Sequence, residues 1–127
     1  MRRSVTVAAV ILVLVLAVGG GCEWANGRLV RKYQLQLLRV GSALAEEQWQ
    51  AARRSAEQLS ADWERESAVV QLWVNHGDTD AVTHALRGLV SAIALRDSLS
   101  SLLFYGDCME NFAHLHHRDA FTLKNIL

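Results

Sequence analysis

Apolar residues fill the start of the chain without interruption by charge. Residues 4–22 carry no charged side chain, and between Val5 and Val18 only Thr6 is polar. A helix over residues 4–21 would be about 27 Å long, close to the ~30 Å hydrocarbon core of a bilayer. Strands usually have about 4–8 residues, so a buried strand cannot account for this run. The pattern therefore predicts a helix that contacts the lipid bilayer through residues 4–21.

Beyond this run, apolar residues recur at alternating intervals of three and four, which is the spacing of one face of a helix. Three such rows predict helices over about residues 29–44, 49–74 and 78–96. Gly41 interrupts the first row and suggests a kink. The rows consist of Val30, Tyr33, Leu37, Val40 and Leu44, then Trp49, Ala52, Ala56, Leu59, Trp63, Val70 and Trp73 or Val74, then Val82, Leu86, Leu89 and Ile93.

A fourth helix is expected to begin near Asp97 or Ser98, either of which can cap it. Gly106 lies inside this segment and lowers helix stability by about 1 kcal/mol relative to alanine. The tail, residues 121–127, is apolar, and we expect it to fold back onto the bundle. The apolar side of the fourth helix is expected to consist of Leu99, Leu102, Leu103, Met109 and Phe112.

Short polar segments separate the expected helices. Gly77 suits the left-handed position after the second helix, and Asp78 suits the N-cap of the third. Because the connections are short, successive helices should be antiparallel. The predicted fold class is all-α. A transmembrane helix or signal segment over residues 1–22 precedes an extracytoplasmic up-down bundle of about four helices over residues 23–127, similar to a helical-hairpin repeat.

Positive charges on both sides of the apolar run bear on its orientation. Arg2 and Arg3 precede the run and favour a cytoplasmic N-terminus with the remainder outside, whereas Arg28, Arg31 and Lys32 follow it and weaken that bias. The expectation is a single-pass protein of the cell membrane with its domain on the extracytoplasmic side.

Three fates are open for the apolar segment. It could be cleaved as an export signal, although the glycines at 19–21 do not form the usual small-x-small cleavage site. It could end in lipidation at Cys22, although a typical lipobox has a leucine-like residue three positions before the cysteine. We favour an uncleaved anchor with Trp24 at the membrane interface, where amphipathic rings are enriched.

Composition and charge exclude several classes of function. The chain has 13 basic and 13 acidic side chains, and without Arg2 and Arg3 the basic count falls to 11. This balance argues against a nucleic-acid partner, which requires a dense basic face. Two cysteines do not make a disulfide framework. The absence of proline is typical of a chain built from long helices.

The histidine-rich segment near the C-terminus is a candidate metal site. His114 and His117 are three residues apart and would share one face of a helix, whereas His116 would point elsewhere. Structural zinc takes four ligands and catalytic zinc takes three plus water, and the spacing supplies only two. A polar helix end, where protonated histidine favours the dipole, explains the same residues. We therefore expect no metal and no other cofactor.

Other polar groups do not assemble into a predicted catalytic site. His76, Asp80 and His84 are spaced by four, but acids in this segment also suit the N-terminus of the third helix. Adjacent carboxylates, as in residues 46–47 and 64–66, do not face each other on a helix. No catalytic residue and no enzymatic activity are therefore expected.

One cysteine and one tryptophan complete the candidates. Cys108 lies near Asp107 and Glu110 and lacks the basic setting that makes a thiol reactive. Trp73 lies about 80° from the line of Trp63 on a helix, so it could be an exposed anchor for a protein partner.

A membrane-anchored interaction or scaffold protein is the function that these patterns favour, with a protein partner or self-association. An alternative is a metal-binding envelope protein that uses His114 and His117. A third is an envelope hydrolase with an unrecognised carboxylate site.

Four segments together resemble a known family. They are the Gln48-Trp49-x-x-Ala52 turn, Trp63, the stretch from Leu72 to His76, and the closing residues 122–127, which are the most specific. With its N-terminal apolar segment, the chain resembles, over nearly its whole length, the bacterial family of small anchored proteins called domain of unknown function 4363. Residues 103–117 are less charged and more glycine-broken than the family pattern. The resemblance implies an anchored helical architecture and no established activity.

Overall fold

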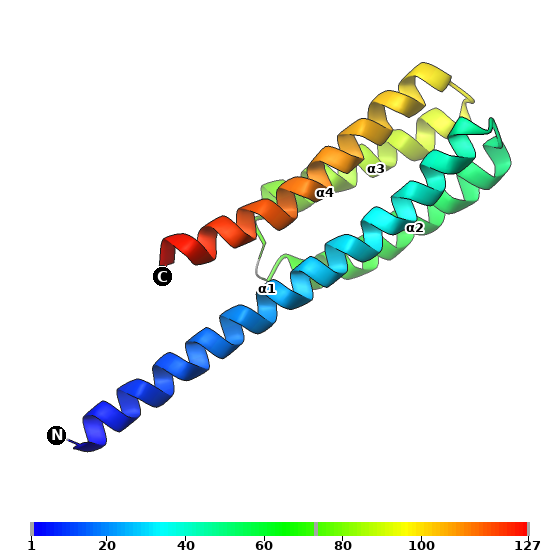
Figure 1. Cartoon of the computed structure of the whole chain (residues 1–127). Coiled ribbons are helices and arrows are strands. Elements are labelled where there is room, and N and C mark those ends of the chain that lie inside the picture. The colour runs from blue at the N-terminus through cyan, green and yellow to red at the C-terminus, as the bar shows by residue number, and fades with distance from the viewer. Residues whose placement is uncertain (1, 73, 127) are drawn as a thin grey trace.

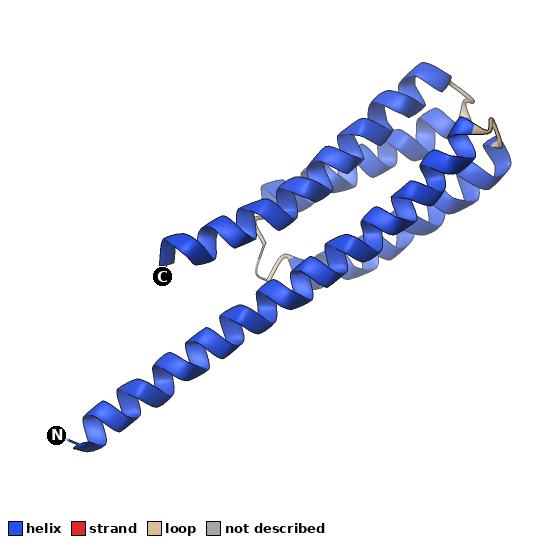
Figure 2. Ribbon diagram, viewed as in Figure 1, coloured by secondary structure: helices blue, strands red, loops and turns tan. Residues whose placement is uncertain are grey.

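The computed structural model of the chain is an all-α bundle, as predicted (Figures 1 and 2). It describes the backbone of residues 2–72 and 74–126, and the side chains of these residues except 22, 23, 26 and 116–126. No strand occurs in this part of the chain. The helices are α1 (Arg2–Ala45), α2 (Trp49–Val70), α3 (His76–Ala94) and α4 (Ser98–Ile126).

The apolar segment and the first bundle helix form one continuous helix. α1 has 44 residues and is therefore about 66 Å long. Its N-terminal half projects from the bundle, and its C-terminal half packs against the other helices (Figure 1). The projecting part, Arg2–Gly21, is long and apolar enough to cross a membrane, and none of it is buried in the protein. The predicted kink at Gly41 does not end the helix, because α1 continues to Ala45.

The bundle has the up-down arrangement that the short connections predict. α1 packs against α2, α2 against α3, α3 against α4, and α4 against α1, so the four helices close into a ring around one core. The turns at residues 46–48 and 95–97 lie at one end of the bundle, and the connection between α2 and α3 lies at the end from which α1 projects (Figure 1).

The core consists largely of the predicted rows. Val30, Tyr33, Leu37 and Val40 of α1 are each no more than 3% exposed. The predicted α2 and α3 rows are also buried, apart from Trp49, which is only partly buried. The buried members are Ala52, Ala56, Leu59, Trp63, Val70, Val74, Val82, Leu86, Leu89 and Ile93.

Three aromatic rings meet at the centre of the core. Tyr33 of α1 stacks on Phe112 of α4 at 5.7 Å between centroids, and Trp63 of α2 meets both rings edge-on at 5.5 and 5.6 Å. The indole Nε1 of Trp63 donates a hydrogen bond to Thr83 Oγ1 of α3 at 2.9 Å. The Tyr33 hydroxyl donates to the backbone carbonyl of Asp62 at 3.1 Å. All four helices are therefore joined at this point.

The connection before α3 differs from the prediction. Asn75, and not Asp78, is the N-cap, and its side chain accepts a hydrogen bond from the backbone N–H of Gly77 at 2.8 Å. Gly77 does not have the left-handed backbone expected of it, because it lies in the first turn of α3. Asparagine is as good an N-cap residue as aspartate, and Asn75 lies three residues before Asp78. The helix therefore begins three residues earlier than predicted.

In each of the other two turns, one non-glycine residue has a left-handed backbone conformation. They are Glu47, with φ of 57°, and Arg96, with φ of 54°. In each turn the next N–H bonds to the carbonyl five residues earlier, Gln48 to Ala43 at 2.9 Å and Asp97 to Ala92 at 3.0 Å. This is the hydrogen-bond pattern of a Schellman motif.

The predicted cap of α4 is confirmed. The Asp97 carboxylate accepts a hydrogen bond from the backbone N–H of Ser100 at 3.1 Å. This bond and the one from the Ser100 hydroxyl hold the pKa of the carboxyl below its ordinary value.

The predicted apolar side of α4 is wrong for its first half. Leu99, Leu102 and Leu103 are 70%, 60% and 63% exposed, and the buried seam instead contains Ser101 and Cys108, each 0% exposed. Small side chains at these two positions let α4 approach the core closely. Phe112 is buried and Met109 partly buried, as expected.

Two aromatic side chains fix this rotation of α4. Phe104 lies against Gly88 of α3, and Tyr105 lies against Gly41 of α1, where an added Cβ would be 2.6 Å from Tyr105 Cζ. Gly41 thus provides space for the Tyr105 ring. The backbone of the tail continues α4 to Ile126, so the expected fold-back is also wrong for residues 121–126, and Leu127 lies outside the described residues.

Candidate interaction surfaces

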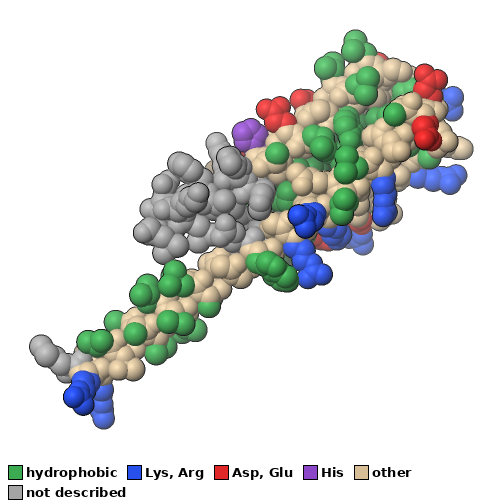
Figure 3. Space-filling view, in the orientation of Figure 1, with side chains coloured by type: hydrophobic (Ala, Val, Ile, Leu, Met, Phe, Trp, Pro, Cys, Tyr) green, Lys and Arg blue, Asp and Glu red, His purple; other side chains and the backbone are tan. Residues whose placement is uncertain are grey.

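An exposed row of leucines crosses the side of the bundle formed by α1 and α4. We call Leu35 and Leu38 of α1, with Leu99, Leu102 and Leu103 of α4, the leucine face; these side chains are 50–70% exposed. Figure 3 shows hydrophobic side chains gathered on this side of the bundle.

The contact between Tyr105 and Gly41 joins the two halves of the leucine face. Leu102 lies three residues before Tyr105, and Leu38 lies three residues before Gly41. Residues at this spacing share one face of a helix. Monomeric proteins rarely expose large contiguous apolar patches, so such a face is typical of a binding surface.

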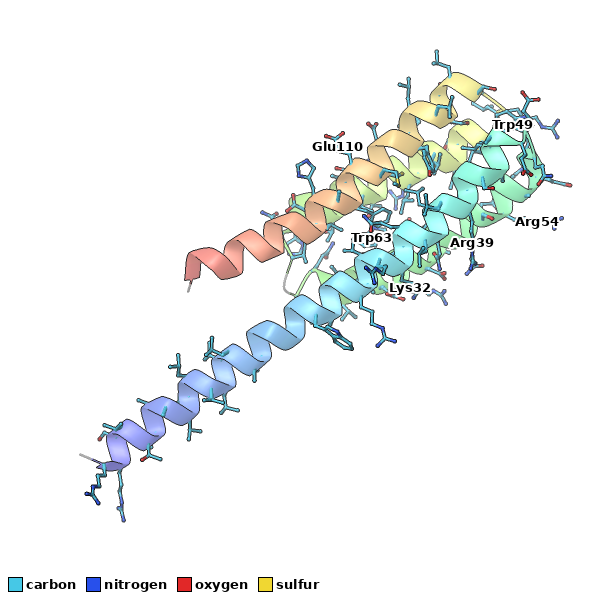
Figure 4. All side chains as sticks on the ribbon, in the orientation of Figure 1. Lys32, Arg39, Trp49, Arg54, Trp63 and Glu110 are labelled. Atoms are coloured by element: carbon cyan, nitrogen blue, oxygen red, sulfur yellow. The ribbon has the colours of Figure 1, made fainter. Side chains whose placement is uncertain are left out.

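Ion pairs gather around α2 instead, within that helix and between it and α1 or α3. The ion pairs are Lys32–Glu66 at 2.8 Å, Arg53–Glu57 at 2.9 Å, Arg87–Glu64 at 3.1 Å, and Arg65 with Asp62. Figure 4 shows Trp63 directed into the bundle, whereas Lys32, Arg39 and Arg54 point outward. The pair of Arg53 with Glu57 is among those that the spacing allows. Most of the side chains in these pairs are exposed, so this part of the surface is in contact with solvent.

The carboxylates at residues 64–66 do not form an acid–base pair. Glu64 bonds to Arg87 of α3 at 3.2 Å, and Glu66 bonds to Lys32 of α1 at 2.8 Å. The two side chains therefore point to different neighbouring helices, as the spacing of two indicates.

A hollow lies beside α1 where it leaves the bundle. Its volume is about 810 Å³, and the glycines at 20 and 27 help to open it. The Arg28 guanidinium lies over the Trp24 ring at 5.4 Å from the centroid. The described lining residues are Gly20, Trp24, Gly27, Arg28, Val30, Arg31 and Gln34. The hollow thus combines an aromatic ring with two arginines at the base of the projecting helix.

The metal candidate His114 lies on the outer surface of α4. The His114 side chain is 62% exposed, and its Nε2 is 4.0 Å from Glu110 Oε1. The side chain of His117 lies outside the described residues. Among side chains that the structure describes, no three of histidine, cysteine, aspartate or glutamate come together as a metal site.

The other candidates are distributed as follows. His76, Asp80 and His84 are all exposed along α3. The side chain of Cys22, the lipidation candidate, and the whole of Trp73, the partner-binding candidate, lie outside the described residues. The sequence analysis did not predict the leucine face or the hollow. The positions of Arg28 and Arg31 shortly after Trp24 were the signal that could have indicated the hollow.

Cys108 has the properties of a structural cysteine. Its side chain is 0% exposed, and burial, followed by the nearby Asp107 carboxylate, raises the pKa of the thiol to about 12. The thiolate, which is the nucleophile, is therefore scarce in the folded protein.

We expect Cys108 of a Cys22→Ser variant to resist a maleimide at pH 8 and to react fully in denaturant, as measured by intact mass. An unfolded cysteine has a pKa of about 8.5. Burial of the neutral thiol therefore stabilises the fold below this pH, and the contribution is lost as the pH rises towards 12. Rapid modification of the native protein at pH 8 would contradict the buried position.

Comparison with known proteins identifies a family. A family model described as Domain of unknown function (DUF4363) matches residues 28–126. No curated protein and no solved structure matches the chain. The matched segment contains the packed part of α1 and the other three helices, but not the projecting part of α1.

Proposed function

The chain belongs to the DUF4363 family, and from this premise we propose that it is a membrane-tethered helical module that binds another protein chain beside it in the bilayer. The proposed role is binding, without catalysis. The leucine face carries the proposal, because five leucines at 50–70% exposure form the row across α1 and α4. The projecting segment Arg2–Gly21 supports the tether.

The orientation of the leucine face favours a second copy of the chain as the partner. The face runs along α1, which is also the proposed spanning helix. Two copies in one membrane can therefore pack side by side about a two-fold axis along the membrane normal. Such an axis keeps each residue level with its own copy, so an isologous contact buries the same leucines on both chains.

In this proposal the domain lies on the extracytoplasmic side of the cell membrane. Arg2 and Arg3 at the start of α1 support that orientation, because positive residues favour the cytoplasmic side.

Crosslinking at the leucine face tests the proposed contact. In a Cys22→Ser background, we expect Leu102→Cys in purified full-length protein in lipid vesicles to form a disulfide dimer under mild oxidation. The matched control is Ala61→Cys, which places a thiol at another exposed position, on α2 and away from the leucine face. Non-reducing gels measure the dimer fraction.

The outcome is read from the difference between the two variants. A dimer fraction several-fold higher at position 102 supports the symmetric contact, and equal fractions contradict it. The Ala61→Cys variant also reports the side of the membrane. A reagent that cannot cross the bilayer should label it in intact cells, and protection until lysis would contradict the extracytoplasmic orientation.

A further inference from the structure

The continuous α1 helix allows each level of the bundle to be placed against the proposed span. Trp24 lies three residues beyond Gly21, or about 4.5 Å at 1.5 Å per residue. The headgroup layer on each side of a ~30 Å hydrocarbon core is about 5–8 Å thick. Residues within about five positions of Gly21 are therefore expected at headgroup depth.

Contacts between α1 and α2 bring a second segment to the same level. Lys32 bonds to Glu66, and Gln36 contacts Asp62, which fixes the register of the antiparallel pair. Leu72 lies six residues after Glu66 and is therefore about level with the residue six before Lys32. That position is about 8 Å beyond the span, at the outer edge of the headgroup layer.

The side chains at this end are apolar and unusually exposed. Leu72 is 81% exposed and Trp24 66%. Leu72 belongs to the connection between α2 and α3, which lies at the end of the bundle from which α1 projects (Figure 1). Exposed apolar side chains held at this depth match a bilayer interface, where tryptophan is also enriched.

Arginines at the same end complement an anionic lipid surface. Helical side chains lean towards the N-terminus, so those of Arg28 and Arg31 lean back towards the proposed membrane. The Arg28 guanidinium over the Trp24 ring, one turn nearer the span, shows this direction. Both arginines line the 810 Å³ hollow beside α1.

We propose that Trp24, Arg28, Arg31 and Leu72, here called the basal surface, bind the bilayer itself. Leu72 and Trp24 insert at the interface, and the two arginines contact phosphate groups of anionic phospholipids. The domain is thereby seated on the lipid and does not stand clear of it on α1 alone. This inference rests on the proposed tether, but it is independent of the leucine face and its partner.

A spin label at Leu72 tests the insertion. In a Cys22→Ser background, Leu72→Cys carries a nitroxide, and the matched control is Leu95→Cys. Leu95 is 80% exposed but lies in the turn at the opposite end of the bundle. The full chain is placed in vesicles of phosphatidylcholine with a minority of phosphatidylglycerol. Collisions with oxygen, which dissolves in lipid, are compared with collisions with a water-soluble nickel complex.

We expect oxygen to dominate at position 72 and the nickel complex to dominate at position 95. Adding Arg28→Gln and Arg31→Gln should raise nickel access at position 72 several-fold, and vesicles of phosphatidylcholine alone should have the same effect. Equal nickel access at positions 72 and 95 overturns the inference. An unchanged signal after loss of both arginines or of the anionic lipid overturns the anionic contact.

Flotation separates failure of this inference from failure of the tether. Each labelled protein is first floated with the vesicles through a density gradient. Protein that floats while position 72 stays open to the nickel complex overturns only the basal surface. Protein that does not float overturns both the tether and the basal surface.

Discussion

Replacing Trp63 with alanine is expected to lower the free energy of unfolding by about 3–5 kcal/mol, the usual cost of removing a large buried aromatic side chain. Trp63 is 1% exposed and contacts the rings of Tyr33 and Phe112 at 5.5 and 5.6 Å. Its Nε1 also bonds to Thr83. The substitution removes one side chain that joins α2 to the three other helices.

Chemical unfolding of the full chain in detergent micelles, followed by circular dichroism, measures this loss. Trp49 is the matched control, because it belongs to the same helix and the same predicted row but is only partly buried. Trp49→Ala should therefore cost less than half as much. A loss of only about 0.5 kcal/mol for Trp63→Ala would contradict its central place, because surface substitutions usually have effects of that size.

Leucine in place of Gly88 is expected to destabilise the bundle by about 1–3 kcal/mol through overpacking. The Phe104 ring occupies the space that a side chain at position 88 would need. The ring must move away, and the seam between α3 and α4 must open with it. Leucine is a better helix former than glycine, so a loss of stability here can come only from packing.

Gly106→Leu is the matched control for this substitution. Gly106 lies within α4, and no atom lies within 4 Å of an added Cβ. The same change there should stabilise the protein by about 0.5–1 kcal/mol through helix propensity.

Removing Phe104 as well tests the cause directly. In a Gly88→Leu, Phe104→Ala double variant, the added leucine can fill the vacated space, so the two losses should not add. Strict additivity, measured by the same unfolding experiment, would show that Phe104 does not block position 88.

The helical rows of the first three helices were predictable because apolar residues make nearly all of their seams. Val30, Tyr33, Leu37 and Val40 are buried as their spacing indicates. The α4 seam was not predictable in the same way, because Ser101 and Cys108 are not recognised as core residues by hydrophobicity. Leucines on the neighbouring face supplied a stronger apolar pattern, and only the contacts of Phe104 and Tyr105 with glycines show which face is buried.

The turns illustrate a second limit of local sequence signals. Glycine is the usual residue in the left-handed position after a helix, yet Glu47 and Arg96 occupy it here. Packing of the adjoining helices offsets the conformational cost at these two positions. Gly77, which matched the signal, lies inside α3.

The candidate surfaces required tertiary structure because each combines residues from separate helices. The leucine face depends on the contact of Tyr105 with Gly41, and the basal surface depends on the register between α1 and α2. Neither register can be read from hydrophobic spacing within one helix. The candidate membrane-spanning segment, by contrast, is local, and its length and composition were visible in residues 4–21.

In the proposed tethered arrangement, the length of α1 beyond its apolar segment sets how far the molecule reaches from the membrane. From Gly21 to Ala45 the helix rises about 36 Å. The turns at residues 46–48 and 95–97 are thus held about that far from the end of the apolar segment. A soluble protein docked there would be kept several nanometres above the lipid, out of reach of anything lying flat on the surface.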